Sequence, residues 1–142
     1  LVMSDDTSHS IRFRMRHTML PVANIDRSVD FYTRLLGMRI LRRRADPAEG
    51  RAIAYVGYGD EASSTVLGLI ATKGEPAAPW AGHVAVAVSD LKALCARLEA
   101  DGVAFAMPLT EVNNSSSRYQ ANIYDPDRFM IELNELKTGV GT

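Results

Sequence analysis

A chain of 142 residues with 46% hydrophobic content is long enough to bury one compact core, so we expect a single domain. Its formal net charge of -1 argues against general attraction to nucleic acid or to an anionic membrane. No apolar run approaches the roughly 20 residues that span a bilayer, and residues 1–10 lack the regions typical of a secretory signal. We therefore expect a cytoplasmic protein.

Two further features look structural. The single cysteine, Cys95, excludes an internal disulfide and shares a helical stripe with leucines, which favours a buried thiol over a nucleophile. A local basic run is interpreted as a solvated strand end; it consists of Arg39, Arg42, Arg43 and Arg44.

The first half of the chain predicts a strand, a helix and three strands. Residues 14–22 alternate as a strand does, and residues 24–37 carry a helical apolar stripe that Asn24 can cap and Gly37 can end. Three strand-like runs follow, at residues 38–44, 51–59 and 64–72. This order is a βαβββ unit.

The second half repeats this order, with a strand, a helix and three more strands at residues 83–88, 89–102, 103–112, 117–125 and 128–136. His17 lies 20 residues before Gly37 and His83 lies 19 before Gly102, so the two halves align as an internal repeat. We predict an α+β fold in which two βαβββ modules form a cupped mixed β-sheet with the helices on the outside.

The predicted boundaries follow from this repeat. A disordered N-terminal segment, residues 1–12, precedes a single domain at residues 13–137, and residues 138–142 form a tail. The modules within this domain are residues 13–73 and 82–137.

Strand parity predicts which side chains line the cup. His83, Ala85 and Ala87 fall on the face opposite three valines that suit the helix-packed side. By the same rule, Gln120 and Asn122 point toward the cup, where they could orient a substrate or simply meet solvent.

Glu132 lies mid-strand, where a carboxylate needs a partner or solvent. It follows His83 by 49 residues, and the first-module position 51 residues after His17 is Gly68. Since the histidines are repeat-equivalent, pseudo-twofold symmetry predicts that Glu132 meets both His17 and His83. Two imidazoles and one carboxylate can bind a divalent transition metal and leave positions open for water or substrate.

The runs "RHTMLPVANIDRSVDFYTRLLGMRILRR", "YVGYG", "GHVAVAV" and "YDPDRFMIEL" closely resemble bacterial glyoxalase I, the lactoylglutathione lyase family of the vicinal oxygen chelate superfamily. The resemblance implies a metal, usually nickel or zinc, in a cup that two chains of a homodimer build together. It also implies that His17, His83 and Glu132 are three of four metal ligands, with Glu132 a catalytic proton-transfer candidate.

The chain departs from the family pattern at three positions. The resemblance implies a fourth ligand, a glutamate, where Gly68 stands, and it implies an arginine at Pro21 and an asparagine at Thr72 that hold glutathione. Gly68 is expected to open space for substrate or an extra water, and Thr72 remains a substrate-binding candidate. Loss of one carboxylate removes a ligand or a base from proton-transfer chemistry.

The leading hypothesis is a glyoxalase-like metal enzyme that performs proton transfer or lyase chemistry on a small chelating substrate, which need not be a glutathione adduct. Iron(II) extradiol dioxygenases and manganese thiol transferases of the superfamily use a similar three-ligand set, so nickel, zinc, iron and manganese stay open. One alternative is therefore a dioxygenase. Another is a metal-independent binding protein of the bleomycin-resistance type.

Overall fold

The computed structural model describes Arg12 and residues 14–48, 50–73, 82–114 and 116–137. The first module contains β1 (His17–Pro21), α1 (Ile25–Asp30), η1 (Phe31–Leu35), β2 (Arg39–Asp46), β3 (Arg51–Gly57) and β4 (Val66–Ala71). The second contains β5 (His83–Ala87), α2 (Leu91–Ala100), β6 (Phe105–Glu111), β7 (Ser117–Tyr124) and β8 (Met130–Leu136). The α+β fold of two βαβββ modules is confirmed. The segment predicted to be disordered, apart from Arg12, and the tail lie outside the described residues.

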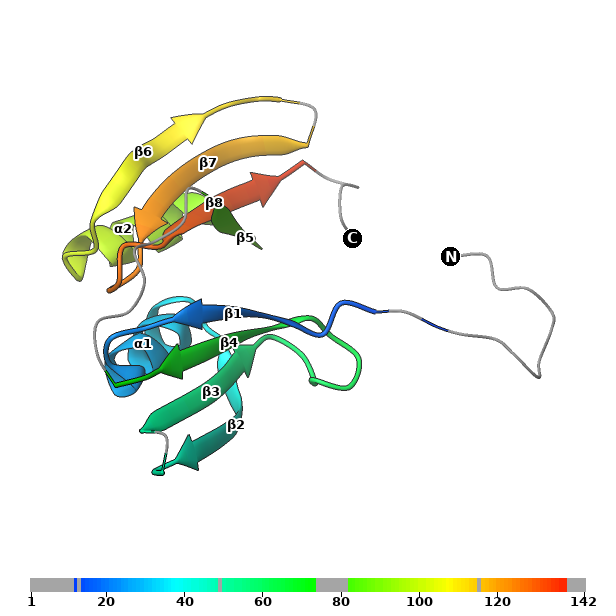
Figure 1. Cartoon of the computed structure of the whole chain (residues 1–142). Helices are drawn as coiled ribbons and strands as arrows, with labels where there is room; N and C mark the ends of the chain where they lie inside the picture. Colours follow the sequence, from blue (N-terminus) through cyan, green and yellow to red (C-terminus); the bar gives the residue numbers. More distant parts are fainter. Residues whose placement is uncertain (1–11, 13, 49, 74–81, 115, 138–142) are drawn as a thin grey trace, which may run out of the picture.

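Each module forms its own four-stranded mixed sheet, with strand orders β1-β4-β3-β2 and β5-β8-β7-β6 (Figure 1). In each sheet the first strand of the module pairs in parallel with the last, and the remaining pairs are antiparallel. The two sheets therefore have the same topology, as the internal repeat predicts.

The first helix begins and ends where the sequence predicts. The side chain of Asn24 accepts a hydrogen bond from the backbone N–H of Arg27, and Gly37 follows the helix with a φ of +69°. Its second half, η1, is a π-helix, which the apolar stripe does not reveal. The Thr33 hydroxyl donates to the Val29 carbonyl over 2.7 Å, and such insertion into the backbone ladder is a known cause of local distortion.

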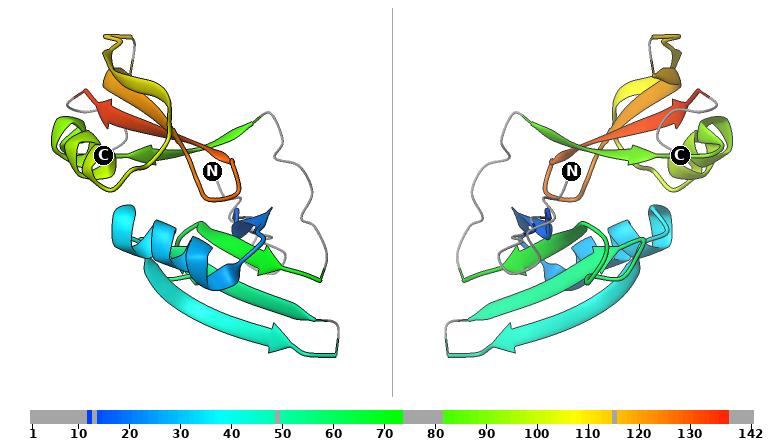
Figure 2. Two further views of the ribbon diagram at one scale, coloured as in Figure 1. Left: turned by 90° about the vertical axis from the view of Figure 1, so that its left-hand side faces the viewer. Right: turned by 90° about the vertical axis from the view of Figure 1, so that its right-hand side faces the viewer.

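One buried cluster joins the helix-covered faces of both sheets. From the first sheet it includes Leu20 and Leu69, and from the second it includes Ile131 and Leu133, all 0% exposed. Both helices contribute to the same cluster, which lies where the two modules meet (Figure 2). Because strand side chains alternate, the opposite faces of both sheets point away from this shared core.

A polar contact also fixes the first helix to the β7–β8 turn. The buried Tyr32 hydroxyl donates to Asp125 over 2.7 Å, and burial raises the pKa of both groups. Asp127 in the same turn accepts hydrogen bonds from the Ala23 backbone and the Ser28 hydroxyl. These bonds hold the modules in one relative position within the chain.

Candidate functional site

His83 and Glu132 meet on the outward face of the second sheet. The His83 Nε2 atom lies 3.2 Å from Glu132 Oε2, with the side chains 45% and 23% exposed. The parallel pairing of β5 with β8 sets this contact, because it places Glu132 beside Ala85, two residues after His83. A nitrogen and an oxygen donor thus converge at one point.

Gln120 and Asn122 share this face. Asn122 pairs with Glu132 across β7 and β8, and the Gln120 amide donates to Asn122 Oδ1 over 3.1 Å. Asn122 in turn approaches the Met130 sulfur at 3.7 Å. The two amides therefore form a polar strip beside the carboxylate, on the side that strand parity predicts.

His17 occupies the corresponding place in the first sheet. Its ring packs edge-on against Tyr55, with ring centroids 5.3 Å apart, and its buried Nδ1 atom has no hydrogen-bond partner. A buried nitrogen without a partner costs free energy, and the ring lacks the hydrogen bond that usually orients a metal-binding imidazole.

Gly68 is the structural counterpart of Glu132. Gly68 pairs with Met19, two residues after His17, just as Glu132 pairs with Ala85, two residues after His83. The correspondence inferred from spacing is therefore correct. The expectation that Gly68 opens space is wrong, because an added Cβ would lie only 2.6 Å from the Met19 sulfur. The flexible Met19 side chain fills the place of the missing carboxylate.

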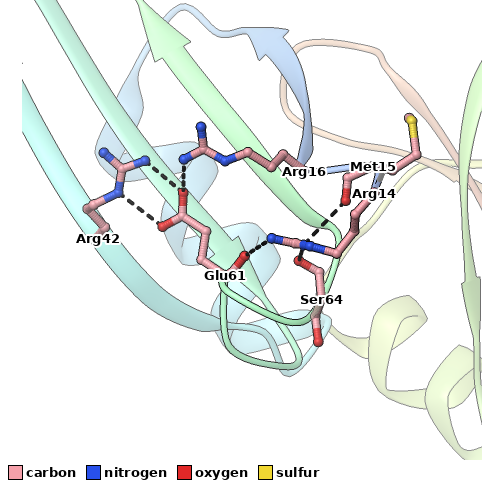
Figure 3. Close-up of polar contacts among 6 residues, drawn as sticks. All are labelled: Arg14, Met15, Arg16, Arg42, Glu61 and Ser64. Carbon is pink, nitrogen blue, oxygen red and sulfur yellow. Dashed lines mark hydrogen bonds and ion pairs between the residues drawn. The ribbon is translucent and has the colours of Figure 1, made fainter. Parts of the chain in front are cut away.

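A stack of side chains extends from His17 across the first sheet. The Arg42 guanidinium lies 4.0 Å from the centre of the Tyr55 ring, which itself contacts His17. Glu61, in the loop between β3 and β4, accepts two hydrogen bonds from Arg42, at 2.7 and 3.0 Å (Figure 3). Arg16 lies 3.5 Å from the same carboxylate. Glu61 therefore fixes the guanidinium over the ring.

The contact of Glu61 with Arg42 should be measurable as a lowered pKa of the Glu61 carboxyl group. The hydrogen bonds from Arg42 lower it below the usual value, and the charges of Arg42, Arg16 and His17 lower it further. A depressed folded-state pKa stabilises the fold above the unfolded value, and this contribution is lost as pH falls through the folded pKa. We expect carboxyl-resolved NMR titration to place Glu61 below the ordinary value of about 4.3.

Arg42→Gln should return the Glu61 midpoint toward that ordinary value. Arg43→Gln is the matched control, because Arg43 pairs instead with Asp26 at 3.0 Å. An unchanged Glu61 midpoint in Arg42→Gln would contradict the assigned cause.

Within one chain, the structure brings together two of the three predicted metal ligands. The part of the chain that the structure describes contains no group of three or more His, Cys, Asp or Glu side chains able to hold a metal. The physical reason is the shared core, which turns the faces carrying His17 and His83 away from each other. The prediction that all three meet therefore fails for a single chain, although their imidazole and carboxylate donors suit zinc, nickel, iron or manganese.

The structure also clarifies the remaining candidates. Thr72 is exposed just after the end of β4. Tyr55, Arg42 and Glu61 were not predicted as site residues. Parity along β3 could have placed Tyr55 on the His17 face, whereas Glu61 lies in a loop, where no alternation predicts the direction of a side chain.

Among the described residues, no helix is long and apolar enough to cross a membrane.

Residues 14–133 match the family model described as the Glyoxalase/Bleomycin resistance protein/Dioxygenase superfamily. The chain belongs to this superfamily. Lactoylglutathione lyase of Neisseria meningitidis serogroup A is 39% identical over 130 residues, which are 89% of this chain and 93% of that protein.

Two solved structures with similar folds have different functions. Glyoxalase I from Leishmania major, described as trypanothione-dependent, aligns with a TM-score of 0.74 and 36% identity over 87% of each chain. An antibiotic binding protein from Streptomyces aligns with a TM-score of 0.69 and 26% identity, covering 91% of this chain and 100% of that one. Both an enzyme and a binding protein thus share this fold.

Proposed function

We propose that this protein is a divalent-metal enzyme of the glyoxalase type that acts on a small substrate with neighbouring metal-binding oxygens. His17, His83 and Glu132 hold the metal. Two chains pair so that His17 of one chain joins His83 and Glu132 of the other. The reaction is a proton transfer or a related lyase step, and the substrate need not be a glutathione adduct.

The observation that carries this proposal is the contact of His83 with Glu132, at 3.2 Å on a partly exposed sheet face. The repeat-equivalent His17 lies on the corresponding face of the other sheet, where its ring packs against Tyr55. Since each face points away from the chain's own core, pairing of two chains is the simplest way to oppose them. Relatives named lactoylglutathione lyase support the enzyme class.

The residues of this chain can take different roles in the proposed reaction. A bound divalent metal would supply Lewis acidity for substrate oxygens that develop negative charge. Glu132 can accept a proton from a carbon next to these oxygens, and Gln120 and Asn122 can donate hydrogen bonds that orient the substrate. Tyr55 forms an apolar wall beside His17.

A second candidate function is metal-independent binding of a small molecule. The Streptomyces antibiotic binding protein favours this candidate, because it shares the fold across its full length. The absence of a carboxylate at Gly68 is compatible with it, since a binding protein needs no proton-transfer base.

The deciding experiment measures metal content and turnover on protein purified without chelators. We expect about one bound metal ion per chain, loss of that metal in His83→Ala, and retention in Gln120→Ala, which changes the same face without removing an expected ligand. A screen of hemithioacetals and catechols, with oxygen uptake recorded, separates lyase from dioxygenase chemistry. Metal-free protein that binds a compound without converting it would favour the second candidate.

A further inference from the structure

The outward face of the first sheet carries a basic residue that the metal site does not use. The pairing registers align Arg44 on β2 with Ile53 on β3, and Ile53 with Ile70 on β4. The neighbouring row on the same face runs through Arg42, Tyr55 and Gly68. Arg44 therefore faces the same side as the His17 contact residue Tyr55.

Ion pairing separates Arg44 from the rest of the basic run. Arg39 pairs with Asp60, Arg42 with Glu61, and Arg43 with Asp26 on the opposite side of the strand. Arg44 forms no ion pair or hydrogen bond with any residue in the described parts of the chain. The basic run is largely exposed, as expected of a solvated strand end, but three of its arginines are ion-paired whereas Arg44 keeps its donors available.

A small cavity lies at this arginine. It has a volume of about 170 Å³ and is lined by Arg44, Ala45, Asp46, Arg51 and Ile53. Arg51 lies 3.8 Å from Asp46, so the lining places the Arg44 guanidinium beside an arginine–aspartate pair. The cavity is below the roughly 300–1,000 Å³ of pockets that enclose a whole ligand, and therefore suits one end of a molecule.

The cavity also lies near Tyr55, whose ring contacts that of His17. Ile53 is two residues from Tyr55 and Arg44 is one strand farther, which places the Arg44 backbone about 8 Å from that of Tyr55 by ordinary strand geometry. Ile53 and Ile70 lie side by side in the Arg44 row and give an apolar floor there. A charged end at Arg44 could thus belong to a molecule whose other end reaches His17.

We propose that the Arg44 cavity is an anion subsite, and that the substrate carries a carboxylate, phosphate or phosphonate group at the end opposite its metal-binding oxygens, with an apolar segment between them. The subsite itself rests on Arg44, the cavity and the sheet register, while its link to a substrate rests on the proposed function. Arginine favours such anions because its planar donors match their oxygens in charge-assisted hydrogen bonds.

The test titrates inorganic phosphate and, separately, succinate into metal-free protein at constant ionic strength, with backbone amides followed by NMR. We expect saturable shifts at β2 and β3 amides around Ala45 and Ile53. Apparent affinity should fall at least fivefold in Arg44→Gln, recover in part in Arg44→Lys, and stay unchanged in Arg43→Gln. Arg43→Gln removes the same charge from the opposite face of the same strand. Comparing phosphate with succinate tells which anion class the subsite prefers.

Absence of saturable shifts on these strands would overturn the proposal, as would equal weakening in Arg44→Gln and Arg43→Gln. Zinc binding, measured by calorimetry on the same variants, distinguishes failure of the anion subsite from failure of the proposed metal site. We expect Arg44→Gln to bind zinc as the unsubstituted protein does. If zinc fails to bind any variant while the anion shifts persist, the metal proposal fails and the subsite stands.

Discussion

Mixing a His17→Ala chain with a Glu132→Ala chain is expected to restore activity that neither variant has alone. In a shared site, the heterodimer contains one position with intact His17 from one chain and intact His83 and Glu132 from the other. Each homodimer should lose at least about 100-fold in activity. Loss of a metal ligand should reduce activity more than the 10–100-fold reduction that follows loss of a residue hydrogen-bonded to a ligand. Random pairing at equal amounts should then recover about one quarter of full activity.

Two controls make this result specific. Mixing His83→Ala with Glu132→Ala should recover nothing, because both side chains belong to the same half of the site. Subunit exchange is followed independently by mass spectrometry of isotope-labelled chains. Confirmed exchange with no recovery in the first mixture would exclude a site shared between chains.

Strand parity and repeat spacing predict the positions on each sheet correctly. They place His17 and Gly68 on one face of the first module and His83 and Glu132 on the matching face of the second, as the registers show. This works because side chains alternate strictly along a strand, so an apolar face fixes the direction of every other residue. The counts from each histidine, 51 and 49 residues, differ mainly because the connection before the last strand is longer in the first module, at residues 58–65, than in the second, at residues 125–129.

The same reasoning cannot say what each outward face meets. An apolar stripe shows which face is buried, but it does not show whether the covering partner is the other module or another chain. In this chain the helix-covered faces of both modules share one core, which leaves His17 apart from His83. Pseudo-twofold symmetry alone was therefore insufficient to bring the three ligands together.

Local side-chain packing lies equally beyond the sequence pattern. Met19 fills the place that the missing carboxylate would occupy, because an unbranched thioether can adapt its shape to a gap. Glu61 approaches Arg42 from a loop, where no period constrains its direction. The sequence does not distinguish Arg42 from the other basic residues of its run. Only the pairing of β2 with β3 shows that Arg42 lies over the Tyr55 ring.

Gly68→Glu is expected to supply the fourth ligand only when Met19 gives way. An added Cβ would meet the Met19 sulfur at 2.6 Å, and this atom lies near the end of a flexible side chain that can change rotamer. In the Gly68→Glu, Met19→Ala double variant, we expect metal to bind at least roughly tenfold more tightly, judging from the 10–100-fold effects of weaker outer-shell contacts. Native turnover should fall if the reaction needs the coordination position that glutamate then occupies.

The controls distinguish the effect of the carboxylate from the effect of added side-chain bulk and from the effect of losing Met19. Gly68→Ala with Met19→Ala adds a Cβ without an acid, and Met19→Ala alone removes only the thioether. Metal affinity is measured by competition with a chromophoric chelator, and turnover is measured on the same preparations. If the glutamate variant matches the alanine variant in both measurements, the position equivalent to Glu132 in the first sheet does not face the metal, and the paired-chain site must be arranged differently.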